Sequence, residues 1–201
     1  EKKLTAYHEA GHAVVARFLP NHDDIHEISI IPRGMAGGYT MYRPTEDKSY
    51  VSKAEMKEQI VSLLGGRMAE KLILDDISTG ASNDIERATK IARQMVMKYG
   101  MSDNIGPIMY GSSEEEVFLG RDMTTHSREY SEQTASEIDH EVRSIIMNAY
   151  KSAEKQTIEE LKLLKKPFVV LVNTTKPYSE ETRNIVRDIE NLESNKGTFK
   201  E

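Results

Sequence analysis

The sequence predicts a mainly α-helical domain with one small β-hairpin near residues 27–43. Several long segments repeat apolar residues at every third or fourth position, which is typical of helices with one buried face. Two short segments instead alternate apolar and polar residues on either side of a glycine-rich stretch, which is typical of a hairpin. We expect one domain over residues 1–193 and a short disordered tail at residues 194–201.

The first predicted helix covers residues 2–19, and Pro20 ends it. An apolar stripe at helical spacing is formed by Leu4, Tyr7, Gly11, Val14 and Phe18. The stripe beside it is formed by His8, His12, Val15 and Leu19. We expect the first stripe to be buried and the two histidines to lie at its margin.

The predicted hairpin follows this helix. Ile28 and Ile30 alternate with polar residues in IHEISII, and Tyr39 and Met41 do so in YTMYR. The connection PRGMAGG is rich in glycine, but no Gly-Lys-Ser/Thr follows it. It therefore does not match a phosphate-binding loop.

The remaining chain is predicted to be mostly helical. Ser52 and Glu55 form a capping-box pattern at the start of a helix over residues 52–73. Further helices are expected at residues 84–99, 127–153, from a second capping box at Thr157, and from Ser179 to Leu192. Residues 101–124 are expected to be a loop, and the apolar run at 168–172 is compatible with a strand or a helix.

The motif HEAGH in the first helix points to a metal site. His8 and His12 are one turn apart and differ by only about 40° around the helix, so both rings can reach one point. Glu9 flanks that point without occupying it. Two histidines at this spacing with a glutamate beside the first are typical of a zinc site that has a general base next to it.

A catalytic zinc usually takes a third protein ligand. The position ten residues after His8, where one class of zinc peptidases has a third histidine, is Phe18. An acidic residue further along the chain is therefore expected. Asp84 is the first candidate because it lies on the same side of its helix as Ala88. The alternatives are Glu86, Asp75 and Asp76.

The other four histidines are not expected to bind metal. His22 and His26 are also four residues apart, but they span the change from turn to strand, so we interpret them as surface residues. His126 and His140 lie in polar surroundings and are expected to be solvated.

Composition excludes several classes of protein. Lys and Arg total 27 against 33 Asp and Glu, and no basic cluster stands out, so we expect no nucleic-acid partner. The chain has no cysteine, which excludes disulfides and thiolate metal sites. No apolar run is long enough to span a bilayer, so we expect this piece to be soluble. Because Glu1 already lies in a helical pattern, we expect it to come from a longer protein.

Five segments in consistent order carry a family resemblance: HEAGH, SIIPRGMAGGYT, LLGGRMAEKLI, STGASNDIERATKIARQMV and YGMS. Over about residues 2–155 the chain resembles the proteolytic domain of FtsH, the membrane-anchored, ATP-dependent zinc metalloprotease family. The resemblance implies that Asp84 is the third zinc ligand, with His8 and His12. Residues 166–185 depart from the family pattern, where a leucine-rich helical segment is usual.

The resemblance also implies the setting of the domain. It implies a zinc endopeptidase with one Zn²⁺ per chain, acting on unfolded or membrane-extracted protein chains. It implies an AAA+ ATPase module in the same polypeptide and a homo-hexamer. The full-length protein would lie in a bacterial inner membrane or an organellar membrane, with this domain on the cytoplasmic, matrix or stromal side.

A protease for unfolded chains needs a way to hold an extended backbone. We expect the strand from Gly38 to Tyr42 to pair with substrate through main-chain hydrogen bonds. The candidate substrate-binding residues are Gly37, Gly38, Tyr39 and Thr40; the alternative is an ordinary hairpin turn. The alternative functions are a non-catalytic ring-forming module with a structural zinc and an amidase for small substrates.

Overall fold

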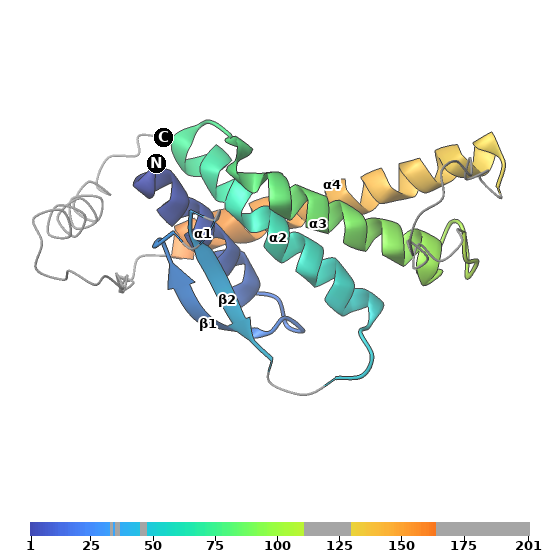
Figure 1. Ribbon diagram of the computed structural model, residues 1–201, viewed down its shortest axis with the longest axis horizontal. Helices are drawn as coiled ribbons and strands as arrows, with labels where there is room; N and C mark the ends of the chain where they lie inside the picture. Colours follow the sequence, from blue (N-terminus) through green and yellow to red (C-terminus); the bar gives the residue numbers. More distant parts are fainter. Residues whose placement is uncertain (33, 35–36, 45–47, 111–129, 164–201) are drawn as a thin grey trace, which may run out of the picture.

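The computed structural model describes residues 1–32, 34, 37–44, 48–110 and 130–163. It is mainly helical with one two-stranded sheet, which confirms the predicted fold class (Figure 1). The helices are α1 (Lys2–Arg17), α2 (Lys53–Leu74), α3 (Ser82–Arg93) and α4 (Glu132–Leu163), with a 3₁₀ turn η1 (Thr79–Ala81) and a π-helical turn η2 (Gln94–Lys98). The strands are β1 (Asp24–Ser29) and β2 (Tyr39–Arg43).

Helix α2 lies at the centre of the fold and contacts α1, α3 and α4. It begins at the predicted capping box, in which the Ser52 hydroxyl accepts from the Glu55 amide and the Glu55 carboxylate accepts from the Ser52 amide. Its fully buried side chains include Ile60 and Met68. These pack in one core with Val15 of α1, Met95 of η2 and Ala153 of α4.

Helices α1 and α2 cross at a pair of glycines. A methyl group on Gly11 would lie 2.5 Å from the carbonyl oxygen of Gly65, and one on Gly65 would lie 2.7 Å from that of Gly11. Glycine in a helix interior costs roughly 1 kcal/mol relative to alanine. The close backbone contact at this crossing explains why both positions lack a side chain. It also lets α1 pack closely against α2.

The hairpin is antiparallel, with Ile28 opposite Thr40 and an irregularity between Ile25 and Glu27. Strand β1 ends at Ser29, so the prediction that Ile30 belongs to it is wrong. The Ser29 hydroxyl accepts a hydrogen bond from the Ile31 amide at 3.2 Å. A serine that binds the backbone two residues on favours a turn, which ends the strand one residue earlier than the hydrophobic pattern indicates.

The predicted helix over residues 84–99 starts two residues earlier and changes form at its end. Helix α3 begins at Ser82, and the last turn, Gln94–Lys98, is π-helical. Gly100 then takes a positive φ of 58°. The loop beyond it is held to α4 because the Ser102 hydroxyl donates to the buried carboxylate of Glu141 at 2.8 Å.

Helix α4 runs from Glu132 through Thr157 to Leu163 without a break. The prediction that Thr157 begins a new helix is therefore wrong. Its hydroxyl donates to the Ala153 carbonyl at 2.8 Å, one turn back, and Thr157 is only 4% exposed. The hydroxyl thus has a partner inside a continuing helix. Some predictions concern residues that the structure does not describe. These are the segments 168–172, 179–192 and 194–201, residues 111–124 of the predicted loop and residues 127–129 of the predicted helix.

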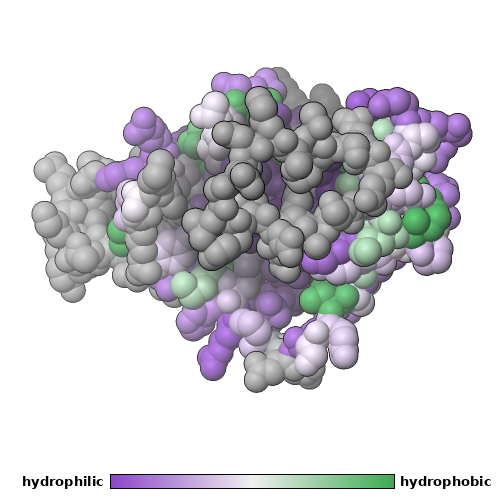
Figure 2. Space-filling view, turned by 45° about the vertical axis from the view of Figure 1, so that its right-hand side comes forward, coloured by the Kyte–Doolittle hydropathy of each residue, from purple (hydrophilic) through white to green (hydrophobic). Residues whose placement is uncertain are grey.

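Among the residues coloured in Figure 2, hydrophilic ones predominate, and the hydrophobic ones form small separate groups. This pattern agrees with a chain in which 30% of residues are charged. In the part of the chain that the structure describes, no helix combines the length and apolar character needed to cross a membrane.

Candidate metal centre

The two histidines of α1 are more deeply buried than the sequence predicts. His8 is 8% and His12 7% exposed, and they lie on one stripe with Val15, which is fully buried. Phe18, at the end of the stripe expected to be buried, is 43% exposed. The expectation that the histidines lie at the margin is therefore wrong. The reason is the glycine crossing, which places α2 directly over the histidine stripe.

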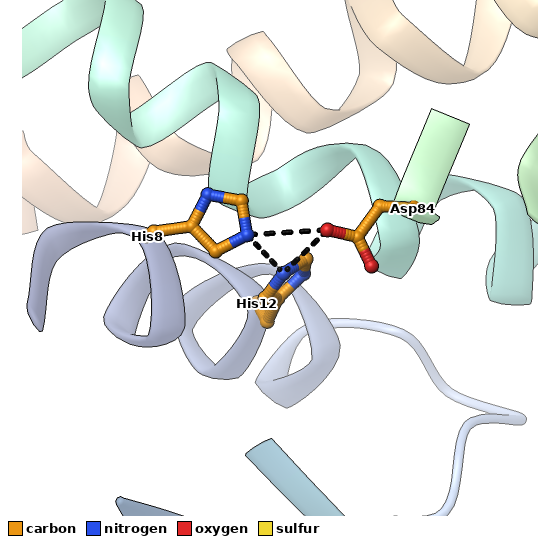
Figure 3. Close-up of side chains that lie close together, drawn as sticks. All are labelled: His8, His12 and Asp84. Carbon is orange, nitrogen blue, oxygen red and sulfur yellow. Dashed lines mark hydrogen bonds and ion pairs between the residues drawn. The ribbon is translucent and has the colours of Figure 1, made fainter. Parts of the chain in front are cut away.

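The structure brings His8, His12 and Asp84 together (Figure 3). The Nε2 atoms of the two histidines are 3.1 Å apart, and Asp84 Oδ2 lies 3.1 Å from His8 Nε2 and 3.5 Å from His12 Nε2. Asp84 comes from the first turn of α3, whose start follows η1. The alternatives Glu86, Asp75 and Asp76 are exposed and do not belong to this cluster.

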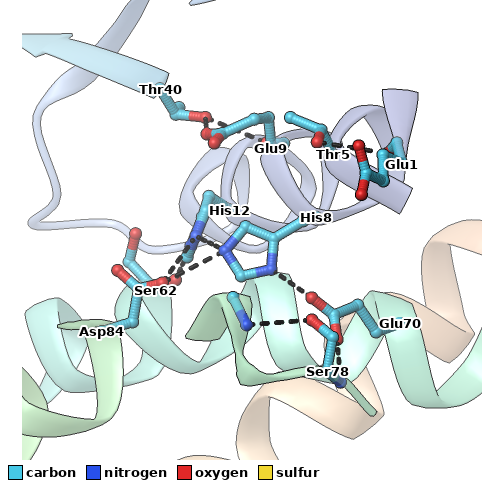
Figure 4. A network of polar contacts seen from close by, with 11 residues as sticks. Glu1, Thr5, His8, Glu9, His12, Thr40, Ser62, Glu70, Ser78 and Asp84 are labelled. Atoms are coloured by element: carbon cyan, nitrogen blue, oxygen red, sulfur yellow. Dashed lines mark hydrogen bonds and ion pairs between the residues drawn. The ribbon is translucent and has the colours of Figure 1, made fainter. Parts of the chain in front are cut away.

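Residues of α2 contact the Nδ1 atom of each imidazole ring (Figure 4). His12 Nδ1 lies 2.8 Å from the Ser62 carbonyl oxygen, and His8 Nδ1 lies 2.7 Å from Glu70 Oε1. A carbonyl and an ionised carboxylate can only accept hydrogen bonds, so we assign the ring proton to Nδ1 in both neutral histidines. Glu70 is fully buried, and its second oxygen accepts from the Ser78 amide at 2.7 Å.

Glu70 is the site residue that the sequence analysis missed. It lies four residues after Gly66, which lies four residues after Ser62, so these positions form a small and polar stripe along a largely apolar helix. A fully buried glutamate needs a hydrogen-bonding partner. That stripe is the signal that could have indicated a contact with the histidines of α1.

The donors and acceptors in this cluster fit a cation. With the proton of each neutral imidazole on Nδ1, both Nε2 atoms present lone pairs to each other and to the Asp84 carboxylate. Three acceptors that converge within 4.8 Å are favourable only if a proton or a metal ion lies among them. Two imidazole nitrogens and one carboxylate oxygen are a ligand set of the kind that catalytic zinc sites use.

The charges around the cluster reinforce this preference. Burial alone would lower the pKa of His8, but its hydrogen bonds to Asp84 and Glu70, and their negative charges, hold that pKa above its ordinary value. Burial alone would raise the pKa of Asp84, but its contacts with His12 and His8 hold it well below the usual range. Asp84 is therefore charged at neutral pH, and a metal ion competes with a proton at His8.

Glu9 follows His8 in α1, and its side chain is directed toward the hairpin. Its carboxylate is nearly buried, with the residue 7% exposed. The Thr40 hydroxyl of β2 lies 2.7 Å from Glu9 Oε2 and 3.0 Å from the Glu9 carbonyl oxygen. Figure 4 shows Glu9 and Thr40 on one side of α1, while the imidazole rings point toward α2. Glu9 is thus held by the strand next to the site.

The residues proposed to bind substrate have different environments. Gly37 is exposed, whereas a methyl group on Gly38 would lie 2.6 Å from the Ser29 carbonyl oxygen and 2.8 Å from Thr5 Cγ2. Close packing inside the protein therefore accounts for Gly38. The Tyr39 hydroxyl donates to Glu27 at 2.8 Å. Within the described residues β2 pairs with no strand other than β1.

The remaining described histidines lie away from the cluster. His22 is half-buried, more than predicted, because its ring lies edge-on to Tyr42 with 4.6 Å between ring centroids. His26 and His140 are exposed, as predicted. His126 lies outside the described residues.

A helical HExxH pair completed by an acidic residue from a second helix is the kind of site that metal-dependent hydrolases have. The family comparison agrees with that class, because residues 1–185 match the model of Peptidase family M41. The chain belongs to Peptidase family M41.

Curated relatives lead to the same family. The chain is 58% identical to the ATP-dependent zinc metalloprotease FtsH of Caldicellulosiruptor bescii, over 92% of this chain and 30% of that protein. It is 55% identical to FtsH 1 of Thermoanaerobacter sp., over 96% of this chain and 32% of that protein. The corresponding FtsH of Thermotoga maritima is 47% identical over 94% of this chain. The chain therefore spans about a third of the length of these relatives.

Proposed function

We propose that this chain is a zinc-dependent endopeptidase domain in which His8, His12 and Asp84 hold the metal and Glu9 is the general base. The observation that supports the proposal best is the convergence of the two histidine Nε2 atoms and the Asp84 carboxylate in one cluster. Zinc held by these residues would supply Lewis acidity, which polarises a peptide carbonyl and makes water acidic enough to react near neutral pH.

The protein groups would then divide the work of hydrolysis. Glu9 takes a proton from the attacking water and returns it to the leaving amine. Thr40 keeps the Glu9 carboxylate in one orientation through its hydroxyl. Ser62 and Glu70 keep the two imidazoles in the tautomer that leaves Nε2 free, since each binds the proton on Nδ1.

Strand β2 is proposed to hold the substrate backbone. No third strand joins this sheet among the described residues, so an extended peptide could add to β2 on the side opposite β1 through main-chain hydrogen bonds. Tyr39 and Thr40 lie on this strand, and Gly37 and Gly38 directly precede it. Because Thr40 also contacts Glu9, a peptide on this strand would lie next to the general base.

The proposal for the whole protein rests on the relatives, which are named ATP-dependent zinc metalloproteases. We propose that an AAA+ ATPase module in the same polypeptide unfolds protein substrates, including membrane proteins, and delivers them to this domain. The full-length protein would be a membrane-anchored homo-hexamer of a bacterial inner or organellar membrane, with this domain on the cytoplasmic, matrix or stromal side.

Replacement of Glu9 by glutamine tests the proposed chemistry. The side chain keeps its shape and leaves all three proposed ligands in place. We expect the variant to retain about one zinc per chain and to cleave an unstructured peptide about 10²–10⁴-fold more slowly. Equal cleavage by the parent and the variant would exclude Glu9 as the base. Failure of the parent to take up zinc would exclude the metal site.

A further inference from the structure

Gly66 of α2 lies directly against the two imidazole rings. A methyl group on this residue would lie 2.7 Å from His12 Nε2 and 2.7 Å from both Nε2 and Cε1 of His8. These three ring atoms are its nearest neighbours, and contacts this short do not occur between real side chains. An alanine at this position would therefore have to displace both rings from the metal side.

The rings cannot move away at low cost, because the opposite nitrogen of each is already bound. His12 Nδ1 is held by the Ser62 carbonyl, and His8 Nδ1 by the buried Glu70 carboxylate. Both partners lie on the same face of α2, four residues on either side of Gly66. Any shift of the rings would break hydrogen bonds in a buried environment, where unmade hydrogen bonds are costly.

We propose that Gly66 is a positioning residue of the metal site, where the absence of a side chain provides the space in which both Nε2 atoms face Asp84. The inference rests on the proposed zinc function, and it adds a residue that binds neither metal nor substrate. It also assigns different roles to the paired glycines. Gly65 faces the backbone of Gly11 and lets the helices cross, whereas the three atoms nearest to a methyl group on Gly66 all belong to the rings.

The first experiment compares Gly66→Ala with the parent. Zinc affinity is measured by competition with a chromophoric chelator, and Co²⁺ spectra report the coordination geometry. We expect Gly66→Ala to fold, to bind zinc at least tenfold more weakly and to give an altered Co²⁺ spectrum. Parental zinc affinity with an unchanged spectrum would overturn the inference. Absence of zinc binding by the parent would instead contradict the proposed function.

The second experiment separates ring contact from helix packing and needs no metal. Gly66→Ala is introduced into the parent and into a His8→Ala/His12→Ala background, and both pairs are melted in EDTA. We expect the melting temperature to fall by several degrees in the parent and to stay equal or rise without the rings, because alanine favours helix. The same loss of stability, or of folding, in both backgrounds would show that Gly66 serves packing alone and would overturn the inference.

Gly65→Ala is the matched control, since it places the same methyl group on the residue directly before Gly66 in the same helix. Its methyl group would contact the Gly11 carbonyl at 2.7 Å. The loss of stability should therefore persist in the background without the rings. If Gly65→Ala did not lower the melting temperature in the background without the rings, the experiment would not distinguish ring contact from helix packing. That result would overturn the assignment of different roles to Gly65 and Gly66.

Discussion

Replacement of Thr40 by valine should slow hydrolysis while leaving the metal site intact. Thr40 donates to the Glu9 carboxylate at 2.7 Å, and Glu9 is only 7% exposed, so water cannot readily replace the hydroxyl. Valine has nearly the same shape as threonine and favours strand, so β2 should keep its conformation. The change removes the hydroxyl that contacts the Glu9 carboxylate at 2.7 Å and the Glu9 carbonyl oxygen at 3.0 Å.

The size of the effect follows from the hydrogen bond to the carboxylate. A hydrogen bond to a charged group contributes about 1.5–3 kcal/mol. If this energy fixes the orientation of the base in the transition state, kcat falls by about 10- to 100-fold, since 1.4 kcal/mol corresponds to about a factor of ten. The KM and the zinc content should change little. Thr40→Ser restores the hydroxyl and should restore most of the rate.

The assay is cleavage of an unstructured fluorogenic peptide, with kcat and KM determined separately and zinc measured in each sample. In a Glu9→Gln background, Thr40→Val should have almost no further effect, because both changes act through one carboxylate. An unchanged or faster kcat in Thr40→Val would refute the reasoning. It would indicate that the hydroxyl holds Glu9 in an unproductive orientation or has no part in catalysis.

Three further predictions concern the metal site. Asp84→Asn should weaken zinc binding far more than Glu86→Gln in a chelator competition, because Glu86 is exposed and outside the cluster; equal effects would place the third ligand elsewhere. Glu70→Gln should weaken zinc binding by about 10- to 100-fold through His8, and parental affinity would contradict the orienting role. In EDTA, the raised pKa of His8 stabilises the folded protein. This stabilisation is fully present below pH 6.5, the ordinary pKa of histidine, and is lost as the pH rises through the raised pKa of His8. The zinc-loaded protein should instead become more stable over the same pH range. Melting curves across this range in EDTA and in zinc test the opposite signs.

The local half of the site could be predicted from the sequence, because it depends on spacing within one helix. His8, Glu9 and His12 are adjacent in sequence, and helical geometry alone brings the two rings together. Asp84 required more, since its helix face was predicted but its distance from α1 depends on how α1, α2 and α3 pack. Glu70 was missed because its contacts with His8 and Ser78 depend on how these segments pack.

The errors in the fold have similar causes. The hydrophobic pattern of α1 favoured burial of the stripe that ends at Phe18, but Gly65 of α2 lies against Gly11 and Val15, and Gly66 lies against the rings of the histidine stripe. Thr157 matches a capping pattern, yet packing of α4 against the core keeps its helix continuous. In both cases a tertiary contact outweighed a local preference.

The proposed ligands are far apart in sequence, with His8 and Asp84 separated by 76 residues. An ion held by both would cross-link the chain much as a disulfide does, closing a loop that contains the hairpin and all of α2. In the chain-entropy model, closing a loop of this length restricts the unfolded state by about 4.5 kcal/mol. The ion would thus also link α1 to α3, because α3 could not detach from α1 without releasing it. A chelator would therefore speed unfolding as well as stop proteolysis.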